Sequence, residues 1–187
     1  MTRSLVSVVV APVPAVPAEV THRIGLAAVA AVRRFVAADV ASTIGLKWPN
    51  DVLIGDRKLA GILAQRVPGH DAVVVGMGLN VAWAPEGAAA IASAVHDTEV
   101  TPAQVLRSVL EEFDALPADI ALQYREALVT IGQWVRVELP GAAAPLHGRA
   151  VAVDDAGRLV VDVDGVGHAL DVGDVVHVRS TAGENRV

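Results

Sequence analysis

Two short segments hold the residues of this 187-residue chain whose types and spacing could do chemistry. The first is Lys47-Trp48-Pro49-Asn50-Asp51, and the second, which begins seven residues later, is Lys58-Leu59-Ala60-Gly61-Ile62-Leu63. Lysine ammonium groups attract phosphate and carboxylate, and a glycine lets a ligand approach the backbone closely. The two segments together are therefore a candidate anion-binding site.

Turn chemistry predicts how the chain presents these lysines. Pro49 has no backbone N–H to donate, and the two residues after it favour turns, so a strand over residues 44–48 should end there. We expect strands over 52–54 and 58–66 to form a hairpin around a glycine-containing loop. Alternation along the second strand predicts Ala60 and Ile62 on the face of Lys58, and Gly61 on the opposite face. From residue chemistry alone, a surface hairpin with merely solvated lysines is the favoured interpretation.

The flanking sequence predicts a sheet backed by helices. Apolar runs predict buried strands over 4–11 and 72–81, and the second run contains Gly76-Met77-Gly78-Leu79-Asn80. Helical spacing predicts a helix from Glu19 to about residue 38, and a capping box at Thr101 followed by Pro102 predicts the start of another. A further helical segment is expected over 118–128, and residues 84–98 should be a loop with about one helical turn.

From residue 131 the pattern changes to short alternating segments separated by glycine and proline turns. We expect strands over 133–139, 146–154, 158–164, 168–172 and 175–179, which would form a small antiparallel barrel. The chain is thus expected to be α+β, with a first domain over 1–129, a second over 130–180 and a frayed tail over 181–187.

Composition excludes several classes of protein. The net charge is −6, with eight basic and seven acidic residues in 1–98 and seven basic and fourteen acidic residues in 99–187. General attraction to nucleic acid or to an anionic membrane is not expected, and no apolar run is long enough to span a membrane. The absence of cysteine removes thiolate chemistry and fits a cytoplasmic location. The six histidines are scattered, so no metal site is expected from them, and Gly76-x-Gly78 lacks the third glycine of a dinucleotide fingerprint.

The two segments resemble the signature of the biotin protein ligases, and the spacing between them is also similar. The resemblance continues through Gly76-Met77-Gly78-Leu79-Asn80-Val81 and through the helical region to a C-terminal stretch that Thr130-Ile131-Gly132 introduces. It covers about residues 5–179 and reverses the preference for a solvated hairpin. It implies a partial mixed sheet backed by helices, like that of class II aminoacyl-tRNA synthetases and biotin ligases, followed by an SH3-like barrel.

The resemblance also implies roles for individual residues. Lys58 would be the catalytic group, because the matching lysine reaches both biotin and the α-phosphate of ATP. Gly61 and Ile62 would line the biotin pocket. The remaining implied binding residues are Lys47 as electrostatic support, Asn50 and Asp51 in the turn and near magnesium, Gly76 and Gly78 where the ligand passes, and Asn80 toward the nucleotide.

The implied activity has two steps. Biotin and Mg²⁺·ATP would give biotinyl-5′-AMP, and a lysine of the biotin carboxyl carrier domain of a carboxylase would then take the biotin. A relative that joins lipoate instead of biotin is a weaker alternative, since the Lys-Trp-Pro-Asn-Asp form of the motif disfavours it.

The resemblance leaves one expected part unmatched. Family members carry a Gly-Arg-Gly-Arg-x-Gly-Arg loop before the strand that corresponds to Leu5–Val10. In this sequence the one arginine before that strand is Arg3. A mis-assigned start, a split gene and a short non-catalytic protein that binds nucleotide or carrier protein are the three explanations, in that order. The chain alone is therefore expected to be a poor catalyst. No helix-turn-helix domain is recognised, so operator binding is not expected.

Overall fold

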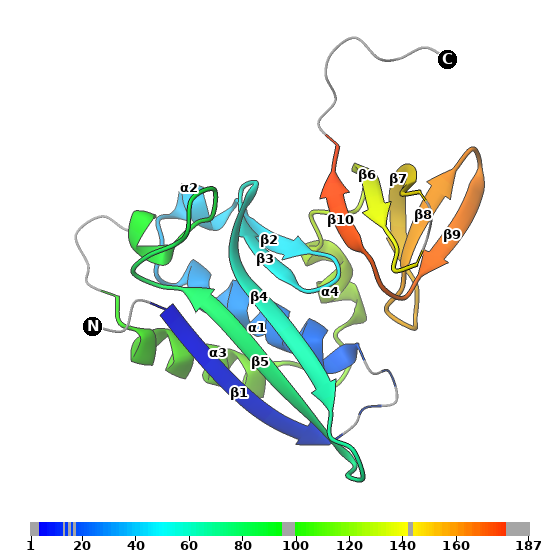
Figure 1. Ribbon diagram of the computed structural model, residues 1–187. Helices are drawn as coiled ribbons and strands as arrows, with labels where there is room; N and C mark the ends of the chain where they lie inside the picture. The colour runs from blue at the N-terminus through cyan, green and yellow to red at the C-terminus, as the bar shows by residue number, and fades with distance from the viewer. Residues whose placement is uncertain are drawn as a thin grey trace.

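The computed structural model describes residues 4–12, 14, 16, 18–94, 100–141 and 144–178, without the side chains of 4–11. Figure 1 shows a sheet with helices behind it and, to one side, a second and smaller sheet. The expected tail over 181–187 lies outside the described residues. Within the described part, no helix is long and apolar enough to cross a membrane.

The first sheet has five antiparallel strands in the order β1-β5-β4-β3-β2. A single bridge from Leu46 to Leu128 is the one parallel pairing of the described residues. The expected mixed sheet is therefore antiparallel throughout its named strands. The strands are β1 (Ser4–Pro12), β2 (Ile44–Lys47), β3 (Asp51–Ile54), β4 (Arg57–Arg66) and β5 (Ala72–Asn80).

Helices cover one face of this sheet and leave the other face open, as Figure 1 shows. Helix α1 (Glu19–Arg33) packs on the strands and on α3 (Pro102–Ala115). A Cβ placed on Gly25 of α1 would lie 3.1 Å from a Leu46 methyl group and 3.6 Å from Ile62 Cδ1. The small residues of α1 thus allow the helix to approach the sheet closely, with large strand side chains filling the interface.

Two helices are shorter than the sequence predicts. Helix α1 ends at Arg33 rather than near residue 38, because the Arg33 guanidinium donates to the carbonyl oxygens of Ala41 and Ile44 and holds the chain in a turn. The short helix α2 (Ala38–Ala41) follows that turn. Helix α4 (Ala121–Ala127) begins at Ala121 rather than at residue 118, because the Asp119 carboxylate accepts a hydrogen bond from the Ala121 backbone N–H just before the first turn. In the expected loop, the helical turn is η1 (Ile91–Ser93), and residues 95–99 lie outside the described part.

The second sheet has the order β10-β6-β7-β8-β9, all antiparallel. Strand β9 begins two residues before its predicted start. Asp164 and Gly165 both have positive φ, which makes a two-residue hairpin turn and lets pairing resume at once. The strands are β6 (Trp134–Glu138), β7 (Leu146–Val153), β8 (Leu159–Val163), β9 (Val166–Leu170) and β10 (Asp174–His177).

Candidate functional site

Lys58 and Gly61 lie together on the open face of the first sheet. The Lys58 ammonium contacts the Asp51 carboxylate at 2.6 Å, and the lysine side chain remains 54% exposed. A Cβ placed on Gly61 would lie 3.1 Å from Lys58 Nζ and 3.6 Å from Asp51 Oδ1. The amine is thus aimed across a glycine, where it can meet an anion lying on the strand.

A β-bulge explains why these two residues share a face, and the alternation argument was wrong here. Lys58 pairs with Leu53, but Ala60 pairs with Val52, so the register shifts within the hairpin. The extra residue, Leu59, is buried, and the strand beyond it is turned by one position. Without the bulge, Lys58 would point toward the helices, as strict alternation predicts.

Three glycines leave part of the open face bare. Gly61 pairs with Gly78, and Gly76 pairs with Leu63 on the same face. No described atom lies within 4 Å of a Cβ built on Gly78, and the nearest atom to one on Gly76 is the Leu63 carbonyl oxygen at 4.0 Å. Leu63 is 71% exposed, an apolar side chain beside this glycine surface that the sequence analysis did not single out.

The other expected binding residues have structural partners of their own. The Asn50 amide donates to the Ile62 carbonyl oxygen at 2.7 Å, and the Asn80 amide donates to the Ala89 carbonyl oxygen at 3.0 Å. Both side chains thus hold loops beside the open face. Ile62 is 2% exposed and its side chain packs toward α1, so only its backbone can reach a ligand on the open face.

Lys47 lines a cleft between the two sheets together with Lys58 and Asp51. The cleft has a volume of about 720 Å³, and its far wall belongs to the second sheet and includes Trp134 and His177. Burial and the positive charge of Lys47 lower the pKa of His177, while Asp56 acts in the opposite direction. The cleft thus presents the ammonium groups of Lys47 and Lys58 and the carboxylates of Asp51 and Asp56.

Trp48 connects the turn of the site to the second sheet. Its backbone N–H donates to the Thr130 hydroxyl at 3.0 Å, and its indole N–H donates to the Gly157 carbonyl oxygen at 3.0 Å. Thr130 is fully buried and its hydroxyl also lies 3.3 Å from His177 Nε2. Trp48 is buried, and its contacts across the two sheets carry no local sequence signal because their partners lie 82 and 109 residues away.

The arrangement offers little for a metal ion on its own. Among the described residues no three acidic or histidine side chains gather where they could hold one. Asp51 is an acidic group at the site, with 16% of its side chain exposed. Mg²⁺ that arrives with nucleotide phosphates needs only one or two carboxylates from the protein, so Asp51 fits that case and a permanent metal site is not formed by these residues.

Comparison with known proteins gives two family matches along the chain. Residues 5–81 match the Biotin/lipoate A/B protein ligase family, and residues 130–178 match the Biotin protein ligase C terminal domain. A biotin–[acetyl-CoA-carboxylase] ligase of Mycobacterium tuberculosis is 41% identical over 165 residues, which are 83% of this chain and 60% of that protein. The ligase of the same name from Paracoccus denitrificans is 33% identical over 65% of this chain and 58% of its own length.

Solved structures show the same fold. The biotin protein ligase of Aquifex aeolicus has a TM-score of 0.80 at 17% identity, covering 94% of this chain and 83% of that one. The same enzyme in complex with biotin and ATP has a TM-score of 0.74 at 18% identity, covering 95% and 79%.

These matches agree on the fold and on the order of its parts. The α+β class and the SH3-like C-terminal domain that the sequence predicts are confirmed. The chain spans about 60% of the length of the two ligases it matches. By its two matched domains and by its relatives, the chain belongs to the biotin protein ligase family.

Proposed function

We propose that this chain forms biotinyl-5′-AMP from biotin and ATP on the open face of its first sheet, and passes biotin to a carrier-protein lysine. The observation that carries the proposal is the placement of the Lys58 ammonium over Gly61, beside the bare surface of Gly76 and Gly78. The M. tuberculosis relative is named a biotin–[acetyl-CoA-carboxylase] ligase, and that name supports a carboxylase carrier domain as the acceptor.

In the first step, an oxygen of the biotin carboxylate attacks the α-phosphorus of ATP and pyrophosphate leaves. Negative charge that collects on the phosphoryl oxygens would be stabilised by the Lys58 ammonium, and Lys47 would lower the repulsion between the two anions from farther away. The glycine surface would let the carboxylate and phosphate lie against the strands, and the exposed Leu63 would contact the apolar part of biotin.

Two further features fit this step. Mg²⁺ bound to the triphosphate would find one carboxylate, that of Asp51, and would neutralise phosphate charge. Asn80 would approach the nucleotide from the end of β5, and the Asn50 amide would keep the turn before β3 in place. The Ile62 contribution would come from its backbone.

In the second step, the ε-amine of an acceptor lysine attacks the acyl carbon of biotinyl-5′-AMP, and AMP leaves with the bonding electrons. The acceptor amine must lose a proton on the way. The cleft between the two sheets, with Trp134 on its far wall, would be the approach for the carrier domain.

The test compares Lys58→Ala with Arg57→Ala in the purified protein, by biotin-dependent formation of biotinyl-5′-AMP. Both residues are exposed cations on the same strand, so the pair separates the placement of charge from its mere presence. Lys58→Ala should lower the rate by at least about 100-fold, as expected when a positioned charge at a transition state is removed. Arg57→Ala should stay within about twofold of the unchanged protein.

Equal rates in the two variants would overturn the role of Lys58. An inactive parent protein that still binds biotin and ATP, with binding weakened by Lys58→Ala alone, would support the ligand site and reject turnover by this chain. An inactive parent that binds neither ligand would reject the proposal.

A further inference from the structure

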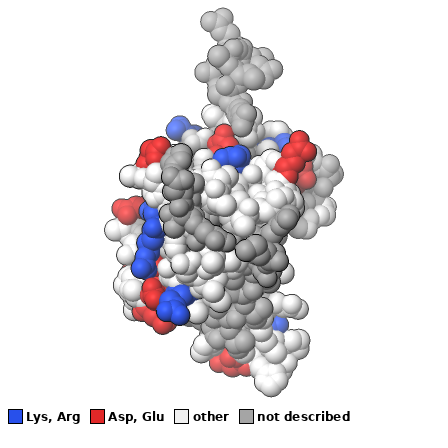
Figure 2. All heavy atoms as spheres, turned by 90° about the vertical axis from the view of Figure 1, so that its left-hand side faces the viewer, with Lys and Arg blue, Asp and Glu red and all other residues white. Residues whose placement is uncertain are grey.

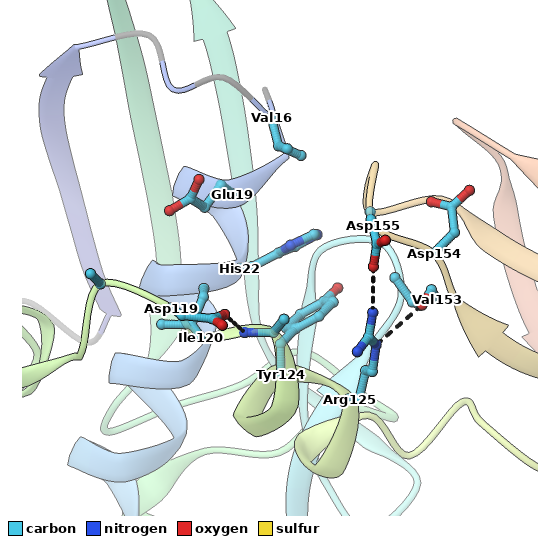
Figure 3. Close-up of a pocket in the computed structure, with 13 residues that line it drawn as sticks. Val16, Glu19, His22, Asp119, Ile120, Tyr124, Arg125, Val153, Asp154 and Asp155 are labelled. Carbon is cyan, nitrogen blue, oxygen red and sulfur yellow. Dashed lines mark hydrogen bonds and ion pairs between the residues drawn. The ribbon is translucent and has the colours of Figure 1, made fainter.

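A second cavity lies where α1, α4 and the β7–β8 turn meet, and it shares no lining residue with the Lys58 cleft. Its volume is about 340 Å³, within the range of small-molecule sites. Figure 3 shows His22 reaching into it from α1 and Tyr124 from α4, with the β7–β8 turn on the opposite side. Nothing in the proposed ligase reaction uses these residues.

His22 and Tyr124 form the floor of this cavity and leave polar atoms without partners. Their rings stack with centroids 3.7 Å apart and an interplanar angle of 17°. The two residues are only 8% and 5% exposed, yet neither side chain makes a hydrogen bond to another described residue. No described side chain has a polar atom that is both sealed from solvent and unpaired, so these polar atoms keep some solvent access, and both residues line the cavity. Buried polar groups of this kind are normally satisfied by a ligand or by water.

The walls of the cavity are held in place by the fold. Gly157 in the β7–β8 turn has a φ of +80°, and a Cβ there would lie 2.8 Å from His22 Cε1. The Gly157 carbonyl oxygen also accepts the Trp48 indole N–H. On the α4 side, the Arg125 guanidinium binds the Asp155 carboxylate at 2.9 Å and the Val153 carbonyl oxygen at 3.3 Å. Hydrogen bonds and close packing thus define the position of the cavity walls where α1, α4 and the β7–β8 turn meet.

The charge of the lining selects against anions. Four carboxylates line the cavity, against the single guanidinium of Arg125. Glu19 and Asp119 are the least neutralised of the four, because Glu19 meets Arg23 only at 3.6 Å and Asp119 accepts a single backbone N–H. Burial lowers the pKa of His22 to about 4, so near neutral pH the ring is uncharged and offers one donor and one acceptor.

From this geometry we propose that the junction cavity binds a flat heteroaromatic amine. The aromatic ring would lie against the His22–Tyr124 stack, where a hydrogen bond to the Tyr124 hydroxyl satisfies an open polar group. The ammonium group would lie toward Glu19 and Asp119. Apolar contacts would come from Val16, Ile120 and Val153, which complete the lining.

Tryptamine and indole-3-acetate are suitable probes, because both contain an indole ring. The side chain of tryptamine ends in an ammonium group, and that of indole-3-acetate ends in a carboxylate. Binding would be measured from the NMR shift of the His22 ring proton, assigned by its loss in His22→Phe. Tryptamine should give a saturable shift and bind about tenfold more tightly than indole-3-acetate. Tyr124→Phe should weaken tryptamine by about fivefold, the effect of losing one neutral hydrogen bond.

Cavity-filling variants provide the control. Ala121→Leu and Ala118→Leu each fill the lining from an exposed position and should abolish the saturable shift. Ala103→Leu makes the same change at an exposed position of α3 outside the cavity and should leave it unchanged. Tight binding of tryptamine by Ala121→Leu and Ala118→Leu, equal binding of both probes, or no saturable shift would each overturn the proposal and leave the cavity to water.

Discussion

A single bulge determines what Lys58 can do. The register shift between Val52 and Leu53 turns the lysine onto the face of Gly61, where its amine reaches the Asp51 carboxylate. The sequence predicts the lysine, the glycine and the hairpin, but not the bulge, because an extra residue in a strand changes no local pattern. The sequence thus predicts which residues form the site, but the face of the sheet on which the Lys58 side chain lies is known only from the structure.

Gly78 tests whether the bare surface matters. Gly78→Val adds a β-favouring side chain where no described atom lies within 4 Å, so the free energy of unfolding should be unchanged or rise by up to about 1 kcal/mol. Biotin affinity should fall by at least about tenfold, because the new side chain occupies the ligand surface. Calorimetric titration and urea unfolding would measure both quantities.

Ala64→Val is the matched control for that change, since it adds similar bulk to an exposed position of β4 on the other face of the sheet. Its biotin affinity should equal that of the unchanged protein. If Gly78→Val also binds biotin normally, the ligand does not lie on this part of the sheet.

At the scale of elements, local signals predict strands and helix starts well. The capping box at Thr101 forms as expected. The Thr101 hydroxyl accepts from the Gln104 backbone N–H, and the Gln104 side-chain oxygen accepts from the Thr101 backbone N–H. The C-terminal end of α1 and the start of α4 differ from the expected bounds, because Arg33 and Asp119 set them through side-chain contacts. The connection of Trp48 to the second sheet was also missed, since it depends on tertiary contact between distant segments.

Thr130 tests that connection between the two sheets. Thr130→Val keeps the shape of the side chain but leaves the buried Trp48 N–H without its acceptor. The free energy of unfolding should fall by about 2 kcal/mol, the cost of an unsatisfied buried donor. Thr130→Ser retains the hydroxyl and should cost less than about 1 kcal/mol. A loss in Thr130→Ser that exceeds the loss in Thr130→Val would show that packing of the Thr130 methyl group, and not the hydrogen bond, is what matters.

At the scale of the whole molecule, two sheets share one junction, with the Lys58 cleft and the His22–Tyr124 cavity on separate parts of it. On the face seen in Figure 2, acidic and basic side chains are interspersed among uncharged ones, with no broad basic field. The separate cavity was not expected from the sequence, which places His22 and Tyr124 about one hundred residues apart.

The burial of His22 in the cavity should make the free energy of unfolding depend on pH. Burial lowers the pKa of His22 from 6.5 to about 4 in the folded protein, so folding disfavours the protonated ring. This contribution is fully present above pH 6.5 and is lost as the pH falls toward about 4, reaching a loss of roughly 2 kcal/mol by about pH 5. The other charged groups that line the cavity around His22 are Glu19, Asp119, Asp154, Asp155 and Arg125.

Urea unfolding at about pH 7.5 and about pH 5 would measure this dependence. His22→Phe keeps a ring against Tyr124 but cannot titrate, so its loss of stability between the two pH values should be smaller by roughly 2 kcal/mol. An identical pH dependence in both proteins would mean that His22 is not the group responsible.

The most direct test of the site is to map biotin onto the protein by amide NMR. Titration with biotin should move the amide signals of Gly61, Gly78 and Asn80, and leave those of the His22 and Tyr124 cavity in place. Signals that move only at the cavity or on the helices, with Gly61 and Gly78 unchanged at saturating biotin, would contradict the placement of the ligand on the open face.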